Sequence, residues 1–183
     1  MNKLNKNLIL LVFVMLITYF GFYPKSYGIS DETENIEVVE CSFEELELER
    51  FLYDMAYTES SNKHNIVSKY GYLGKYQFSL RTLRGIGYNV SKKEFLENPI
   101  IQDEAMVDLL KYNKSVLQRY IDKWDGRIYN GIKITESGIL AAAHLAGTTS
   151  VKNYFRHGTN KADTLGTSIN DYMNKFSGYK LEI

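Results

Sequence analysis

The sequence predicts a mainly α (α+β) domain with a small β-hairpin or loop element. Three observations support this fold class. Several segments are preceded by residues that cap helices, and their apolar residues recur with the spacing of a helix face. Only the stretch 65–78 is rich in glycine and tyrosine without a helical period, which is typical of a loop or a short hairpin. At 183 residues, the chain has room for one domain and an export segment.

The first 28 residues have the pattern of a secretory signal peptide. Lys3 and Lys6 form a short basic region, residues 8–23 are almost entirely apolar, and Ser26 to Gly28 offers small residues for cleavage. An uncleaved membrane anchor over residues 8–23 is the alternative, although the apolar run is a little short for a membrane span. In both cases we expect the rest of the chain to be exported, to the periplasm, to the cell surface or as a secreted protein.

A linker is expected to separate this segment from the folded domain. Residues 29–41 are acidic and have little helical periodicity, which indicates a linker, and the domain is expected over residues 42–183. Cys41 is the only cysteine, so the chain has no internal disulfide, and we interpret this residue as an inert thiol.

Capping residues predict the first helices in order. A capping box at Ser42 begins the first helix, and apolar residues at positions 48, 51, 52, 55 and 56 form one stripe behind it. Ser79 and a second capping box at Ser91 predict two short helices. Asn98 followed by Pro99 predicts a long helix that ends before Gly126. Its expected apolar face consists of Ile101, Ala105, Leu109, Tyr112, Val116, Tyr120 and Trp124.

Three more helices are expected in the last third of the chain. One follows Thr135 and ends at Gly147, and another runs from about Val151 to His157. The last, capped by Thr167 or Ser168, includes Tyr172 and ends near Phe176.

The apolar stripe of the first helix leads to a carboxyl group. Extended by one turn, the stripe reaches Glu59, which places this side chain on the buried face at the carboxyl end of the helix. Burial and the negative end of the helix dipole both disfavour the charged form. A carboxylic acid that stays protonated is the general acid that cleavage of a glycosidic bond requires. The alternative is a solvated glutamate at a frayed helix end.

Four short motifs occur in an order that resembles the lysozyme-like lytic transglycosylases, enzymes that cleave peptidoglycan. The motifs are the pair Glu59-Ser60 at a helix end, a Gly-x-x-Gln turn from Gly74 to Gln77, a helix end from Ala142 to Gly147 and a late tyrosine, Tyr172. The resemblance covers roughly residues 43–179. The chain departs from the family in the third motif, where His144 and Leu145 replace a Tyr-Asn pair.

The resemblance implies a lysozyme-like domain with Glu59 as its catalytic acid. It implies that Ser60 orients the glycan or the intermediate, and that Gln77 hydrogen-bonds the sugar next to the cleaved bond. His144 would replace the family's tyrosine as a polar contact; alternatively, it is an ordinary helix-end histidine. The other expected substrate-binding residues are Tyr72, Gly74, Tyr76 and Tyr172.

The sequence predicts a glycan as the partner and no cofactor. No cluster of histidine, cysteine and carboxylate residues has zinc spacing, so no metal is expected. The net charge is zero and no nucleic-acid-binding motif is present, which argues against nucleic acid. Between Ser60 and Lys93 the chain has lysines, arginines and tyrosines but no acid. This stretch is either a basic face that balances the acidic N-terminal part or a cleft for anionic peptidoglycan. We expect a monomer that contacts a membrane only through residues 8–23.

The expected reaction is cleavage of the β-1,4 bond between N-acetylmuramic acid and N-acetylglucosamine by lytic transglycosylation, which leaves 1,6-anhydromuramic ends. Most glycosidases use two carboxylates, whereas residues 60–78 contain none. A distant acid such as Glu136 or Asp163 could reach the cleft and make the protein a lysozyme-type hydrolase (muramidase). A non-catalytic peptidoglycan-binding or assembly protein is a further alternative. The sequence does not separate wall remodelling from the role of a toxin or phage lysin.

Overall fold

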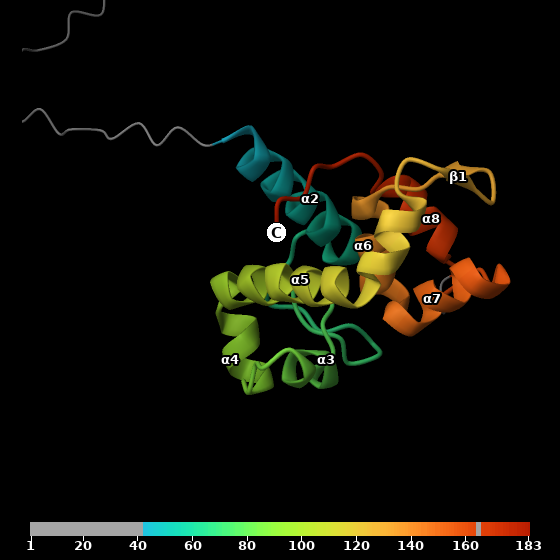
Figure 1. Cartoon of the computed structure of the whole chain (residues 1–183). Coiled ribbons are helices and arrows are strands. Elements are labelled where there is room, and N and C mark those ends of the chain that lie inside the picture. The colour runs from blue at the N-terminus through green and yellow to red at the C-terminus, as the bar shows by residue number, and fades with distance from the viewer. Residues whose placement is uncertain (1–41, 164–165) are drawn as a thin grey trace, which may run out of the picture. The chain divides into compact units, whose positions relative to one another are not determined.

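The computed structural model describes residues 42–163 and 166–183 (Figure 1). The expected signal peptide or anchor, the acidic linker and Cys41 lie outside these residues. Among the helices in the described ranges, none combines the length and the hydropathy that a membrane crossing needs.

The first three helices of the described chain begin at the predicted caps. Helix α2 (Phe43–Ser60) starts with the capping box, in which Ser42 and Glu45 each accept a hydrogen bond from the other's backbone N–H. The predicted stripe of this helix is confirmed at its centre, where Phe51, Met55 and Ala56 are buried. The short helices α3 (Leu80–Gly85) and α4 (Lys92–Glu97) follow Ser79 and Ser91.

The long helix α5 (Pro99–Trp124) also begins at its predicted cap, but it buries a different face. Ala105 and Leu109 are buried as expected, whereas Tyr112 is 51% exposed. Gln102 and Asn113 are buried instead. The buried face also includes Met106, Leu110, Leu117 and Ile121, so the predicted stripe is rotated away from it. The polar residues at positions 102 and 113 interrupt the apolar pattern of this face in the sequence.

The small β element lies after α5 and not in residues 65–78. Strands β1 (Ile128–Tyr129) and β2 (Ile132–Lys133) pair antiparallel through a turn in which Asn130 and Gly131 have positive φ of 49° and 78°. Residues 65–78 form a loop with isolated bridges, from Leu73 to Val67 and to Phe78. An Asn-Gly pair between apolar residues is the sequence signal that could have located the hairpin.

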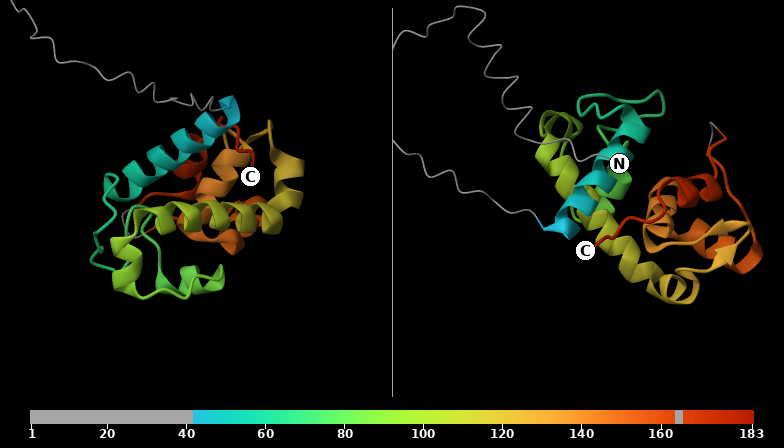
Figure 2. Two further views of the ribbon diagram at one scale, coloured as in Figure 1. Left: turned by 90° about the vertical axis from the view of Figure 1, so that its left-hand side faces the viewer. Right: turned by 90° about the horizontal axis from the view of Figure 1, so that it is seen from above.

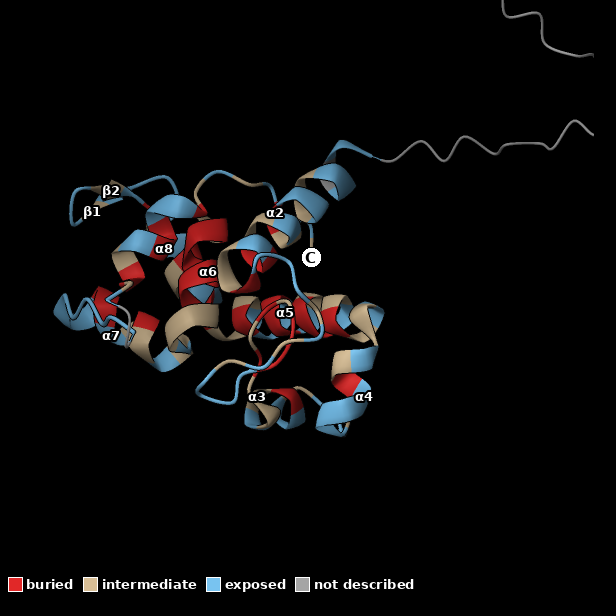
Figure 3. Cartoon of the chain, turned by 180° about the vertical axis from the view of Figure 1, so that it is seen from behind, coloured by how far each residue is buried: buried red, intermediate tan, exposed pale blue. Residues whose placement is uncertain are grey.

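Helix α6 (Glu136–Ala146) is at the centre of the fold and packs against α5, α7 (Thr148–His157) and α8 (Ile169–Lys175). Figure 3 shows how much of α6 is buried. A Cβ atom on Gly138 would lie 2.5 Å from the backbone oxygen of Met173, so α6 and α8 approach closely only because of this glycine. Helix α2 lies on one side of α5, and α3 and α4 lie on the other (Figures 1 and 2). The predicted fold class, mainly α with a small β element, is confirmed.

Candidate active site

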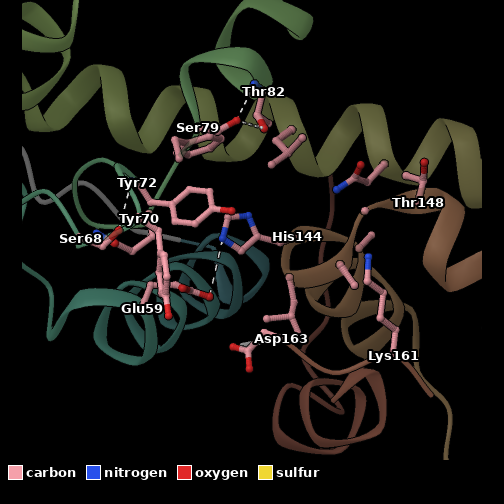
Figure 4. Close-up of a pocket in the computed structure, with 18 of the residues that line it drawn as sticks. Glu59, Ser68, Tyr70, Tyr72, Ser79, Thr82, His144, Thr148, Lys161 and Asp163 are labelled. Carbon is pink, nitrogen blue, oxygen red and sulfur yellow. Dashed lines mark hydrogen bonds and ion pairs between the residues drawn. The ribbon is translucent and has the colours of Figure 1, made fainter. Parts of the chain in front are cut away.

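A cavity of about 900 Å³ opens where several parts of the chain meet (Figure 4). Its walls come from the end of α2, the loop 68–79, the middle of α5, the end of α6 and the segment 161–163, with Thr82 of α3 and Thr148 at the start of α7. Its polar side chains include those of Glu59, Gln77, Asn113, His144 and Asp163. Since a small-ligand site is a concave pocket with a few convergent polar groups, this cavity is the candidate active site.

Glu59 lies on the wall of this cavity, at the carboxyl end of α2, with 16% of its side chain exposed. The hydroxyl of Tyr172 donates a 2.5 Å hydrogen bond to Oε1, and Nε2 of His144 lies 3.8 Å from the same oxygen. Both contacts engage Oε1. Within residues 42–163 and 166–183, Oε2 of Glu59 has no hydrogen-bond partner, so this oxygen is available to a ligand.

Tyr172 reaches Glu59 from α8, 113 residues later in the chain. Its ring is buried and packs against Phe176, with 5.3 Å between the ring centroids. Burial, and then the negative charge of Glu59, raise the pKa of Tyr172. Its hydroxyl therefore stays protonated and acts as a donor to Glu59.

His144, at the end of α6, is bound on one nitrogen and unpartnered on the other. Its Nε2 lies 2.9 Å from the backbone oxygen of Tyr76. Because a carbonyl oxygen only accepts, Nε2 carries the hydrogen in this contact. Nδ1 is buried and has no hydrogen-bond partner in the described part of the chain. His144 is thus held by the loop through one nitrogen, and its largely buried side chain forms part of the cavity lining.

The Gly-x-x-Gln segment forms a tight turn beside Glu59. Leu73 and Phe78 exchange two backbone hydrogen bonds, of 2.8 and 2.9 Å, and enclose Gly74 to Gln77. Gly74 has φ of +70°, and a Cβ atom on it would lie 2.2 Å from Oε1 of Gln102. Gln77 has φ of 52°, its Nε2 donates to the backbone oxygen of Gly74 at 2.8 Å, and its side chain lines the cavity. Gly74 therefore shapes the turn, and the side chain of Gln77 is the part of the turn that a ligand in the cavity can contact.

Four of the expected substrate contacts do not line the cavity: Ser60, Gly74, Tyr76 and Tyr172. Tyr172 instead contacts Glu59, and Gly74 shapes the turn, while the other two have structural partners. Ser60 closes α2, since its Oγ donates to the backbone oxygen of Ala56 at 3.2 Å and accepts from the backbone N–H of Lys63 at 2.9 Å. Tyr76 is buried in the core, and its hydroxyl donates to Asp103 at 2.6 Å. Tyr72, in contrast, is half-exposed and lines the cavity.

The basic stretch between Ser60 and Lys93 contributes little to the cavity. Lys69 lines it, with its Nζ 4.9 Å from the centre of the Tyr70 ring. Lys75 instead forms a 2.6 Å ion pair with Asp103. A second cavity lysine, Lys161, comes from outside the predicted stretch.

The sequence did not single out Asp163 or Asn113 as site residues. Asp163, weighed only as a distant acid, lines the cavity on the other side of Glu59 from Tyr72 (Figure 4), and its Oδ1 accepts from the backbone N–H of Thr167 at 2.8 Å. Glu136, the other distant acid, pairs with Lys114 at 2.9 Å outside the cavity lining. No periodicity or motif in the sequence marks the segment around Asp163. Among the described residues, no group of three or more histidine, cysteine or acidic side chains could hold a metal ion.

Comparison with family models, with curated proteins and with solved structures found no match to this chain. Support for a function therefore comes from the geometry of the cavity and from the order of the motifs.

Proposed function

We propose that this protein is an exported, lysozyme-like enzyme that cleaves the glycan strands of bacterial peptidoglycan with Glu59 as its general acid. The observation that carries the proposal is the environment of Glu59. One carboxyl oxygen is held by Tyr172 and the other has no partner among the described residues of the cavity wall. An oriented acid in a cleft is what proton transfer to a glycosidic oxygen needs.

The reaction we propose is lytic transglycosylation. Oε2 of Glu59 gives its proton to the oxygen of the leaving N-acetylglucosamine as the bond from this oxygen to C1 of N-acetylmuramic acid breaks. The C6 hydroxyl of the same muramic residue bonds to C1, and the Glu59 carboxylate takes the proton of that hydroxyl. The product has a 1,6-anhydro ring. No water and no second carboxylate take part.

The cavity has the size and the surface that suit such a glycan. Its volume is within the range of small-ligand sites. Tyr70 and Tyr72, which are exposed, offer apolar faces to sugar rings, while Lys69 and Lys161 offer positive charge to the lactyl and peptide carboxylates.

Hydrolysis, as in a muramidase, is the second candidate because Asp163 lines the same cavity. A second carboxylate could act as a nucleophile or activate a water molecule. The variant Asp163→Asn separates the two reactions. Transglycosylation predicts that it still cleaves purified walls and leaves 1,6-anhydro ends. Hydrolysis predicts that it is inactive and that the wild type leaves reducing ends.

The direct test of the proposed function is loss of turbidity of purified cell walls. Glu59→Gln keeps the size of the side chain but has no proton to give, so we expect its rate to fall by roughly 10²- to 10⁴-fold. Glu136→Gln, which changes an acid outside the cavity lining, is the matched control and should retain the wild-type rate. Equal rates for Glu59→Gln and the wild type, or no clearing by either, would overturn the proposal.

A further inference from the structure

Helix α5 buries two carboxamide side chains, and one of them is fully paired. Gln102 is 0% exposed. Its Oε1 accepts from the backbone N–H of Lys75 at 2.8 Å, and its Nε2 donates to the backbone oxygens of His64 and Phe95 at 2.9 and 2.7 Å. This amide therefore has a structural role, since it joins α5 to the loop and to α4.

The second carboxamide, Asn113, has no such partners. Asn113 is 3% exposed, and its Nδ2 is buried without a hydrogen-bond partner among the described residues. Unlike Gln102, it lines the cavity. A buried amide without a partner destabilises a fold, so a role in binding a ligand explains this residue better than a role in packing.

The surroundings of Asn113 indicate the chemistry of that ligand. Leu109 lies one helical turn earlier on the same face of α5 and also lines the cavity. Ala143 and Ala146 of α6 line it as well. This part of the wall thus offers a neutral N–H donor beside an apolar surface. Its complement is an uncharged carbonyl oxygen next to a methyl group, which is the structure of an acetamido group.

We propose that Asn113 binds the acetamido group of an N-acetylated sugar, with Nδ2 donating to the carbonyl oxygen and Leu109 contacting the methyl group. This assignment rests on the proposed function and makes Asn113 a specificity-determining residue. A glycan without the acetyl group leaves the buried amide unpaired, so the cavity discriminates against it.

Binding measurements on the full chain test this assignment. All variants carry Glu59→Gln so that the sugar is not consumed, and the ligands are chitotetraose, which is N-acetylated, and cellotetraose, which is not. We expect Asn113→Leu to weaken chitotetraose binding by about tenfold. Cellotetraose binding and the Tm should stay unchanged or increase, because leucine removes an unpaired polar group from the interior. Asn113→Ala, which avoids crowding, should show the same loss of chitotetraose binding.

Gln102→Leu is the matched control, since it removes a paired carboxamide from the same helix and should lower the Tm. Unchanged chitotetraose binding in both Asn113 variants would overturn the assignment. A parallel loss of both sugars, accompanied by a fall in Tm like that of Gln102→Leu, would also overturn it. In these two cases the parent still binds the glycan, and the proposed function stands. If the parent binds neither sugar and the wild type clears no walls, both proposals fail.

Discussion

Glu59 and Tyr172 form a pair in which the tyrosine fixes one carboxyl oxygen and leaves the other to the cavity. The apolar stripe of α2 predicted the position of Glu59 because helical periodicity is a local property. The order of motifs singled out Tyr172. Their contact spans 113 residues of sequence and could be known only from the fold.

Tyr172→Phe tests the importance of this contact. The variant keeps the buried ring and its packing against Phe176 but removes the donor to Oε1 of Glu59. Because a hydrogen bond to a charged group is worth about 1.5–3 kcal/mol, we expect kcat on peptidoglycan to fall roughly tenfold or more. KM and the Tm should change little. Initial rates and thermal unfolding measure these effects, and an unchanged kcat would show that Tyr172 does not position the acid.

At the scale of elements, the starts of helices follow from local chemistry. The caps at Ser42, Ser91 and Asn98 satisfy backbone groups within a few residues, so the sequence contains all that these helix ends need. The buried face of α5 depends on remote partners. Gln102 is inside because His64 and other distant backbone groups pair with it, which no apolar pattern reveals.

The turn from Gly74 to Gln77 places the Gln77 side chain on the cavity wall and holds His144 through the backbone oxygen of Tyr76. Gly74→Ala should destabilise the protein by about 2 kcal/mol or more, since the new Cβ adds a clash with Gln102 to the strain of a positive φ. Gly71→Ala is the control. Its φ is also positive, at +83°, but nothing lies within 4 Å of the new Cβ.

Chemical denaturation gives the two free energies of unfolding. We expect Gly74→Ala to lose clearly more stability than Gly71→Ala, and to lose activity as well. Equal losses of unfolding free energy in the two variants would show that the clash with Gln102 does not destabilise Gly74→Ala.

At the scale of the whole molecule, the cavity is assembled from segments that no local signal links. Glu59, Asn113 and Asp163 belong to three different parts of the chain and share one cavity. The fold class could be predicted from helix caps and periodicity. Which residues line the cavity depends on how α5, α7 and α8 pack around α6, and this packing is not a local property of the sequence.

The stability of the folded domain should fall at alkaline pH. Burial, and then hydrogen bonds to Asp108 and Asp54, raise the pKa of Tyr88 and of Tyr179 from 10.0 to about 12. The folded state therefore holds these protons more tightly than the unfolded state. Their contribution to stability is fully present below pH 10 and is lost as the pH rises through 12.

Thermal unfolding at several pH values measures this effect. We expect the Tm to fall steadily above pH 10. It should fall less steeply in Tyr179→Phe, because this variant lacks the hydroxyl that donates to Asp54 and therefore one of the two titrating groups. A Tm that stays constant up to pH 12 would contradict the assignment of these hydrogen bonds.

Mass spectrometry of the muropeptides released from purified walls tests the central claim most directly, because it reports both the cleavage and its chemistry. The wild type should release fragments with 1,6-anhydromuramic ends, and Glu59→Gln should release none above background. Reducing muramic ends alone would contradict transglycosylation and favour hydrolysis. The same fragments from both proteins, or none from the wild type, would contradict the role of Glu59 itself.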